Sequence, residues 1–340
     1  MTETPADTVT WPPDLGTDTP KICLGAGADA DTMRHLRQIG VDHVLAGGGS
    51  VPWDEADLRE RIEQYNAGGI TLCNLMMSGF DDVIFGGPRR DEQIEQVIES
   101  IRAAGRAGLP VIEYNFYANR LIDGYKEEAG RGGAGYTAYD YELSKDLPPK
   151  DDVGTHTRAE QMQRAKYFLE AIIPEAEKSD VRLALHPNDP PIPISRGSEQ
   201  IMDTFEHWKE YLDLVPSPYN GMTYDCGVTR ELGEDPVAVC RYLGERDCIN
   251  HMHYRNVIVR QPYSDYTEVF VDEGQVDMFA VMKEVVRQKY SRALYPEHPR
   301  ALDIDRKQGI ENMYPGGGGM VAQVYNVSYT KAMLQAALSS

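Results

Sequence analysis

Short apolar runs alternate with amphipathic stretches along almost the whole 340-residue chain. The apolar runs have the length and composition of buried strands, and the stretches between them carry apolar residues at helical spacing. Because a helix between two strands allows them to lie parallel, this alternation predicts an α/β fold with a parallel sheet. Eight such units favour a closed (β/α)8 barrel, the TIM barrel, over an open doubly wound sheet. The expected strands cover residues 21–27, 43–48, 70–75, 110–116, 181–185, 222–227, 249–253 and 293–298, and the expected helices 29–39, 53–66, 91–107, 158–178, 198–214, 235–244, 276–288 and 321–338.

The alternation is interrupted once, after the fourth strand. Residues 118–157 are rich in glycine, tyrosine and charged side chains and have no clear periodicity. A long segment of this kind inside a compact domain usually covers or binds at a functional site, so we expect a lid-like insertion rather than a disordered one. The expected organisation is a flexible leader over residues 1–20 and a single catalytic barrel domain over residues 21–340.

The composition narrows the choice of partners. The chain carries 34 Lys and Arg against 54 Asp and Glu, a formal net charge of −20, which argues against nucleic acids and anionic membranes. No apolar run is long enough to span a bilayer, and the acidic N-terminus is unlike a signal peptide, so a cytoplasmic protein is expected. Five cysteines without a paired CxxC spacing indicate no disulfide framework. The expected partner is a small molecule, and homo-oligomer formation stays open.

Four consecutive strand ends carry residues of the types that bind metals: His186, Cys226, His253 and Glu297. Taken singly, each could be a structural residue, but in a parallel barrel the carboxyl ends of the strands meet at one rim. Two imidazoles, a thiolate and a carboxylate suit a divalent transition ion better than calcium or magnesium. We therefore predict a site for a divalent ion; the spacing does not choose among manganese, iron, cobalt and zinc, and our expectation is manganese. His251 could replace His253, but its position further from the strand end favours a supporting role.

Several of these strand ends also resemble one enzyme family. Residues 185–191, Leu-His-Pro-Asn-Asp-Pro-Pro, are similar to the His-Pro-Asp-Asp-Pro-Pro signature of mannonate dehydratases, in the xylose-isomerase-like barrel superfamily. Residues 114–116 (Tyr-Asn-Phe), 225–227 (Asp-Cys-Gly) and 253–257 (His-Tyr-Arg-Asn-Val) match further family motifs in order. The chain departs from the family at Glu297, where the family has Asp, at Pro299, where it has Gly, and at Asn188, where it has Asp.

The resemblance implies a metal-dependent sugar-acid dehydratase that converts D-mannonate, or a closely related aldonate, to 2-keto-3-deoxy-D-gluconate and water. It implies that His298 is catalytic, and that a tyrosine after the eighth strand supplies the second proton-transfer group. We expect this to be Tyr314, with Tyr325 and Tyr329 as alternatives. The residues expected to bind the substrate are Arg255, Arg300, Tyr114 and Asn115. Two other functions stay open: a sugar isomerase or epimerase on the same barrel, and a catalytically silent binder of metal or sugar acid.

Overall fold

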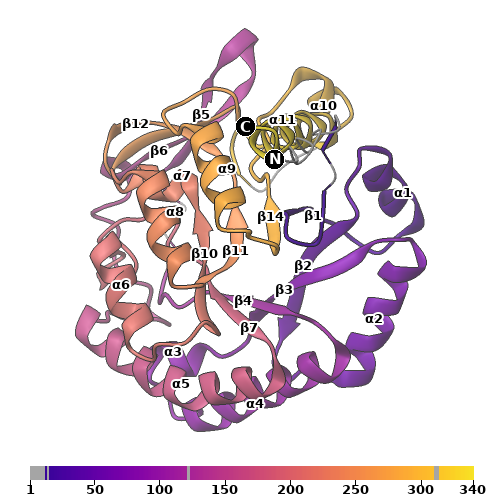
Figure 1. Cartoon of the computed structure of the whole chain (residues 1–340). Helices are drawn as coiled ribbons and strands as arrows, with labels where there is room; N and C mark the ends of the chain where they lie inside the picture. The colour runs from indigo at the N-terminus through magenta and orange to yellow at the C-terminus, as the bar shows by residue number, and fades with distance from the viewer. Residues whose placement is uncertain (1–11, 14, 121–122, 310–313) are drawn as a thin grey trace, which may run out of the picture.

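The computed structural model describes residues 12–13, 15–120, 123–309 and 314–340, and most of the expected leader lies outside these ranges. Its central feature is a closed barrel of eight parallel strands (Figure 1). Each barrel strand pairs with the preceding one, and the last pairs with the first, which closes the barrel. The TIM-barrel prediction is therefore confirmed. The barrel strands are β1 (Lys21–Gly25), β2 (His43–Ser50), β3 (Thr71–Ser78), β4 (Val111–Tyr114), β7 (Arg182–Leu185), β10 (Asn220–Asp225), β11 (Ile249–His253) and β14 (Ala293–Tyr295).

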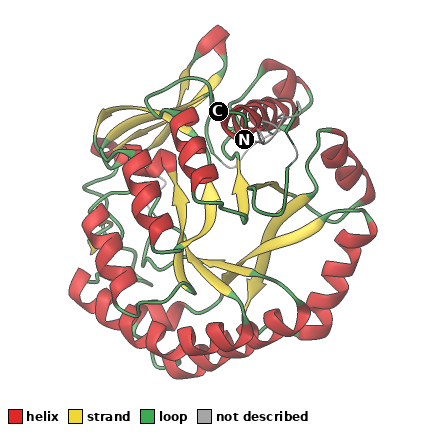
Figure 2. Cartoon of the chain, in the orientation of Figure 1, coloured by secondary structure: helices red, strands yellow, loops and turns green. Residues whose placement is uncertain are grey.

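Helices connect successive strands and form a ring around the barrel (Figure 2). The longer helices bury an apolar face, as the periodicity predicts, and no helix within the described ranges is long and apolar enough to cross a bilayer. The connecting helices are α1 (Ala30–Gln38), α2 (Glu55–Ala67), α4 (Arg90–Ala107), α5 (Arg158–Ser179), α6 (Phe205–Asp213), α8 (Pro236–Glu245), α9 (Met278–Arg287) and α11 (Met320–Leu338). Shorter helices follow three of the strands: α3 (Asp81–Phe85), α7 (Cys226–Glu231) and α10 (Asp303–Lys307).

Several expected boundaries are wrong: the first, fourth and eighth strands end at Gly25, Tyr114 and Tyr295, earlier than expected, and two further boundaries have a clear local cause. The helix expected over residues 198–214 begins only at Phe205, because the Thr204 side chain accepts a hydrogen bond from the His207 N–H and caps the helix there. The residues before it form a short antiparallel pair, β8 (Ile194–Ser195) with β9 (Ser198–Glu199). The strand expected to run through Cys226 ends at Asp225, which caps α7 in the same way through the Val228 N–H.

The insertion after the fourth barrel strand contains two strands, β5 (Tyr125–Ala129) and β6 (Gly135–Asp140). They join an antiparallel hairpin from the segment after β11, formed by β12 (Asn256–Gln261) and β13 (Asp265–Val269), in a four-stranded sheet ordered β12-β13-β6-β5. We call it the cap sheet. It lies beyond the carboxyl end of the barrel, since β13 contacts the residues that follow β14 (Figure 1).

Candidate active site

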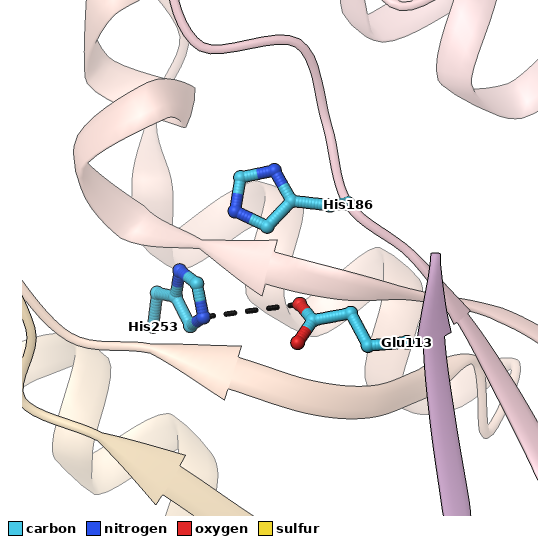
Figure 3. Close-up of side chains that lie close together, drawn as sticks. All are labelled: Glu113, His186 and His253. Carbon is cyan, nitrogen blue, oxygen red and sulfur yellow. Dashed lines mark ion pairs between the residues drawn. The ribbon is translucent and has the colours of Figure 1, made fainter. Parts of the chain in front are cut away.

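Three of the four predicted metal ligands meet at the carboxyl end of the barrel. His186 follows β7, His253 is the last residue of β11, and Glu297 lies just after β14. Nδ1 of His253 is 3.1 Å from Oε1 of Glu297, and the rings of His186 and His253 have centroids 5.1 Å apart. Figure 3 shows these two imidazoles beside Glu113 of β4, whose Oε1 is 3.9 Å from Nε2 of His253. Residues from four strands therefore form one cluster.

The polar atoms of this cluster fit a divalent cation. His186 Nδ1 lies 2.7 Å from the Pro187 carbonyl oxygen, and because a carbonyl only accepts, Nδ1 carries the proton and Nε2 keeps its lone pair. Burial lowers the pKa of His186 and so favours the neutral ring that metals bind. Nδ1 of His253 and Oε1 of Glu297 are buried, and neither makes a hydrogen bond of good geometry, although the two atoms lie 3.1 Å apart. A cation between them would relieve that cost, and imidazole with carboxylate suits a transition ion.

Cys226, the fourth predicted ligand, is placed differently. Its thiol donates a hydrogen bond to the Arg255 carbonyl oxygen at 3.2 Å, and burial raises the pKa of the thiol. The residue before it, Asp225, forms a group of ligand-type atoms with His253 and Glu297, all within 4.8 Å of one another. Cys226 is the first residue of α7, whereas Asp225 still belongs to the strand. Within the described chain, no such group includes the Cys226 thiol.

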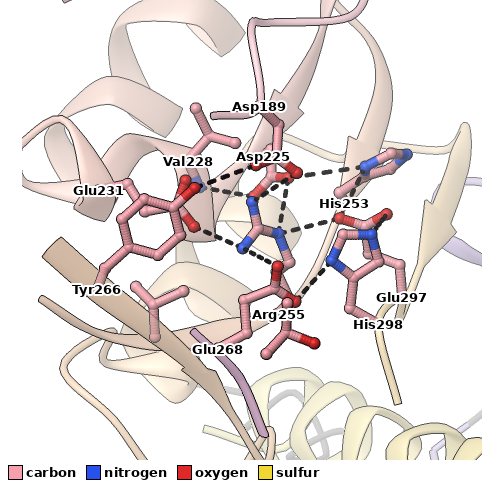
Figure 4. A network of polar contacts seen from close by, with 12 residues as sticks. Asp189, Asp225, Val228, Glu231, His253, Arg255, Tyr266, Glu268, Glu297 and His298 are labelled. Atoms are coloured by element: carbon pink, nitrogen blue, oxygen red, sulfur yellow. Dashed lines mark hydrogen bonds and ion pairs between the residues drawn. The ribbon is translucent and has the colours of Figure 1, made fainter. Parts of the chain in front are cut away.

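Arg255, predicted to bind the substrate, lies at the centre of a buried ion-pair network (Figure 4). Only 2 % of its side chain is exposed, and its guanidinium is 3.0 Å from Asp225, 2.7 Å from Glu231 and 3.0 Å from Glu297. Burial opposes ionisation of Asp225, but Arg255 and His253 outweigh it and hold the pKa of Asp225 well below its usual range. Arg255 therefore balances the negative charge behind the cluster.

His298 is held by a carboxylate from the cap sheet. Its Nδ1 lies 2.7 Å from Oε2 of Glu268 on β13, and its Nε2 lies 3.4 Å from Oε2 of Glu297 (Figure 4). The same Glu268 oxygen accepts a hydrogen bond of 2.8 Å from Arg300, another predicted substrate residue, which is only 2 % exposed. Burial disfavours the charged imidazole, but Glu268 and Glu297 outweigh it and raise the pKa of His298. The backbone of His298 has φ 46°, in the left-handed region that side chains rarely adopt.

A cavity of about 150 Å³ opens onto this cluster. Tyr314 and Asn115, both predicted site residues, line it, and the hydroxyl of Tyr314 accepts a hydrogen bond from Arg120 of the insertion. The rings of Tyr314 and His298 have centroids 5.8 Å apart. The other residues that line the cavity are Met76, Tyr117, Arg120, His186, Asp189, Glu297 and His298.

Tyr114, the remaining predicted substrate residue, points the other way. It is fully buried against Phe168 of α5, and its hydroxyl is 2.8 Å from that of Tyr211 on α6. Because successive side chains of a strand face opposite sides, its neighbour Glu113 faces the barrel interior. The structure therefore brings Tyr114 to the helix layer and not to the cavity.

Sequence reasoning missed several buried acids of the site, of which Glu113 is the most central. Its carboxylate accepts hydrogen bonds from Asn74 at 3.0 Å and from Thr223, and the fully buried His251 packs edge-on against His253 with ring centroids 5.0 Å apart. Strand alternation could have identified Glu113. No local signal marked Glu268, which lies on a hairpin.

Comparison with known proteins identifies a family for this chain. A family model for D-mannonate dehydratase (UxuA) matches residues 151–339. A mannonate dehydratase of Streptococcus pneumoniae is 30% identical over 323 residues, which cover 85% of this chain and 86% of that protein. A mannonate dehydratase of Thermotoga petrophila is 28% identical over 320 residues, which cover 82% of this chain and 88% of that protein. The crystal structure of mannonate dehydratase from Streptococcus suis serotype 2 superposes with a TM-score of 0.84 at 24% identity and covers 94% of this chain and 95% of that one. A xylose isomerase-like TIM barrel protein from Mycobacterium smegmatis, in complex with magnesium, shares the fold with a TM-score of 0.58 at 13% identity, covering 96% and 100%. The chain thus belongs to the D-mannonate dehydratase (UxuA) family of hydro-lyases.

Proposed function

We propose that this chain removes water from D-mannonate, or from a closely related aldonate, to form 2-keto-3-deoxy-D-gluconate. The observation that carries the proposal is His298, which Glu268 holds at 2.7 Å and which lines the same cavity as Tyr314, His186 and Glu297. One cavity thus holds two groups that can move protons and a set of metal ligands. Those are the parts that the reaction needs.

His186, His253 and Glu297 would hold the metal ion, with Cys226 or Asp225 completing the set. We propose manganese as the ion and keep iron, cobalt and zinc as alternatives, because imidazole and carboxylate donors can bind all four. When bound, a divalent ion would hold the substrate carboxylate and 2-hydroxyl and stabilise the negative charge that develops when the C2 proton leaves. Arg255 and the buried acids around it keep Glu297 in place.

The chain's own residues perform the proton transfers. The neutral His298 takes the C2 proton on Nε2, because Nδ1 donates to Glu268 and the carboxylate stabilises the imidazolium that forms. The Tyr314 hydroxyl gives its proton to the 3-hydroxyl, the C3–O bond breaks, and water leaves. His298 then returns its proton to C3 of the resulting enol. The enol hydroxyl gives its proton to the Tyr314 phenolate, which restores the phenol and leaves the 2-keto product. Asn115, on the cavity wall, is placed to contact substrate hydroxyls.

We also propose that the insertion over residues 118–157 covers the active site. Two observations support this role. The segment before β5 supplies Arg120 to the cavity wall, and β6 pairs with β13, the strand that carries Glu268. The cap sheet therefore supports the carboxylate that orients His298.

The test is an incubation of manganese-loaded protein with a panel of hexonates and pentonates, D-mannonate included, assayed for 2-keto-3-deoxy products. We expect product from D-mannonate or one close relative, and its loss in His298→Ala. The matched control is His207→Ala on α6, whose imidazole pairs with Asp203 on the protein's outer layer and should leave turnover unchanged. A metal-loaded protein that forms no such product from any acid would refute the proposal, and isomerised neutral sugars would then point to the isomerase alternative.

A further inference from the structure

Three arginines lie near the proposed active site, and they differ in how far their guanidinium groups are already engaged. Arg255 and Arg300 are each only 2 % exposed and contact buried carboxylates, and neither lines the 150 Å³ cavity. Arg120 of the insertion, in contrast, lines this cavity, and 30 % of its side chain is exposed. Of the three, Arg120 is therefore the arginine that a ligand in the cavity would meet.

The contacts of Arg120 leave part of its guanidinium available. A guanidinium has five N–H groups, all of them donors. The Nε of Arg120 donates to the Asp189 carbonyl oxygen at 2.8 Å, and its Nη1 donates to the Tyr314 hydroxyl. Its Nη2 is 3.7 Å from the Asp189 carboxylate, beyond hydrogen-bond distance, and makes no hydrogen bond to any residue that the structure describes. Donors on both terminal nitrogens can therefore bind a ligand.

The cap sheet holds Arg120 in place through Asp189. The Asp189 carboxylate is only 2 % exposed, and it accepts a hydrogen bond of 2.7 Å from the Tyr125 hydroxyl on β5. The Tyr266 hydroxyl on β13 is 3.5 Å from the same carboxylate oxygen. Asp189 also lies 3.5 Å from Nη2 of Arg255, so two arginines share its charge. Because the guanidinium of Arg120 is fixed before a ligand arrives, little entropy is lost when it binds one.

From this geometry we propose that Arg120 binds the carboxylate of the sugar-acid substrate and thereby selects acids over neutral sugars. The cavity needs such a cation, because Asp189 and Glu297 line it and the chain carries a formal net charge of −20, which repels an anion. A guanidinium suits this role, since it binds a carboxylate through two parallel hydrogen bonds. The inference rests on the proposed function, because it concerns the substrate class of that reaction.

The experiment measures binding in a His298→Ala background, in which the proposed base is absent and the substrate is not consumed. Manganese-loaded protein is titrated by calorimetry with D-mannonate and with its neutral amide, which differs from it only at C1. Arg120→Ala should weaken D-mannonate binding by about 10- to 100-fold, because charge-assisted hydrogen bonds to the carboxylate are lost. Amide binding should weaken much less. Arg120→Lys should give an intermediate affinity for D-mannonate, because it keeps the charge but loses the paired donors.

The matched control is Arg131→Ala in the same insertion. Arg131 pairs with Asp272 and stacks on Phe270, outside the cavity, so the affinity for D-mannonate should not change. An affinity of Arg120→Ala within about threefold of the background, or an equal loss for acid and amide, would overturn the role of Arg120. If Arg120→Ala does not fold, Arg120→Lys decides, and an undiminished affinity there would overturn it.

Turnover tests the proposed function separately. A chain that binds D-mannonate through Arg120, but whose form with His298 intact makes no product, would refute the dehydratase and not the carboxylate contact. A chain that forms product while Arg120→Ala binds D-mannonate undiminished would refute only the contact.

Discussion

Replacement of Glu268 by glutamine tests the catalytic arrangement most directly. The change removes one negative charge with almost no change in shape. Glu268 is buried, and it accepts hydrogen bonds from Nδ1 of His298 at 2.7 Å and from Arg300 at 2.8 Å. A hydrogen bond to a charged group contributes about 1.5–3 kcal/mol, against about 1 kcal/mol for a neutral one. With two such bonds weakened and Arg300 left without its counter-charge, the free energy of unfolding should fall by about 3 kcal/mol.

Two measurements should respond in Glu268→Gln. The melting temperature should fall by about 6 °C, at roughly 2 °C for each kcal/mol in a large chain. The kcat for D-mannonate should fall by about 10²- to 10⁴-fold, because the imidazolium of His298 loses the charge that stabilises it.

The control is Glu127→Gln on β5 of the same cap sheet. Glu127 pairs with Arg306 at the surface, and an exposed pair contributes at most about 1 kcal/mol. Neither kcat nor the melting temperature should change appreciably. If Glu268→Gln keeps kcat within about threefold of the wild type, the carboxylate does not orient the base, and the reasoning is wrong.

Three further predictions concern other parts of the chain. His298→Gly and His298→Ala should both abolish turnover. The glycine variant should be more stable to denaturant by roughly 1 kcal/mol, because glycine adopts the backbone φ of 46° without strain. An alanine variant more stable than the glycine variant would contradict that strain. Glu113→Gln should weaken manganese binding by about tenfold or more in calorimetry, because it removes the charge next to His253, and an unchanged affinity would exclude this support. Burial opposes ionisation of Asp247, but Arg182 and Arg292 outweigh this effect and lower the pKa of the carboxyl group. The ionised Asp247 therefore contributes stability above the unfolded-state pKa, and this contribution is lost as the pH falls through the lower folded-state pKa. The stability advantage of wild type over Asp247→Asn should therefore be larger at neutral pH than in acid, and denaturation curves showing a constant difference would refute the assignment.

The barrel was predictable because its signal is repeated. Each unit buries an apolar strand under an amphipathic helix, so errors at single boundaries, such as the late start of α6 at Phe205, do not change the topology. The cap sheet was not predictable from local periodicity. The strand β6 is mostly buried because β5 and β13 cover it, and β13 lies far away in the sequence.

The candidate site shows the same division. The positions of the strand ends in the sequence predicted that His186, His253 and Glu297 would meet. The reason is that the parallel strands of a barrel all end at one rim. Side-chain direction just past a strand depends on the backbone dihedral angles of each loop residue, which no spacing reveals. Cys226 is the first residue of a helix, and its thiol donates a hydrogen bond to the Arg255 carbonyl oxygen.

Strand alternation contained more information about the site than the prediction used. Glu113 and Tyr114 are neighbours on a regular strand, so only one of them can face the barrel interior. The structure turns the tyrosine toward the helices, where its hydroxyl meets that of Tyr211. A buried glutamate inside a barrel, next to a metal-ligand pattern, is therefore a signal that can be read from sequence alone.

The order in which the chain folds follows from the pairing of β6 with β13. Ala138 lies opposite Thr267, and the intervening segment contains three barrel strands, β7, β10 and β11. Closing so long a loop costs entropy that only the completed contacts offset, and the β5 and β6 hairpin is marginal in water on its own. The barrel must therefore bring the two segments together before the cap sheet can form. The proposed base acquires its carboxylate partner late in folding, so a chain with a formed barrel and no cap sheet has the cluster of His186, His253 and Glu297 but no oriented histidine.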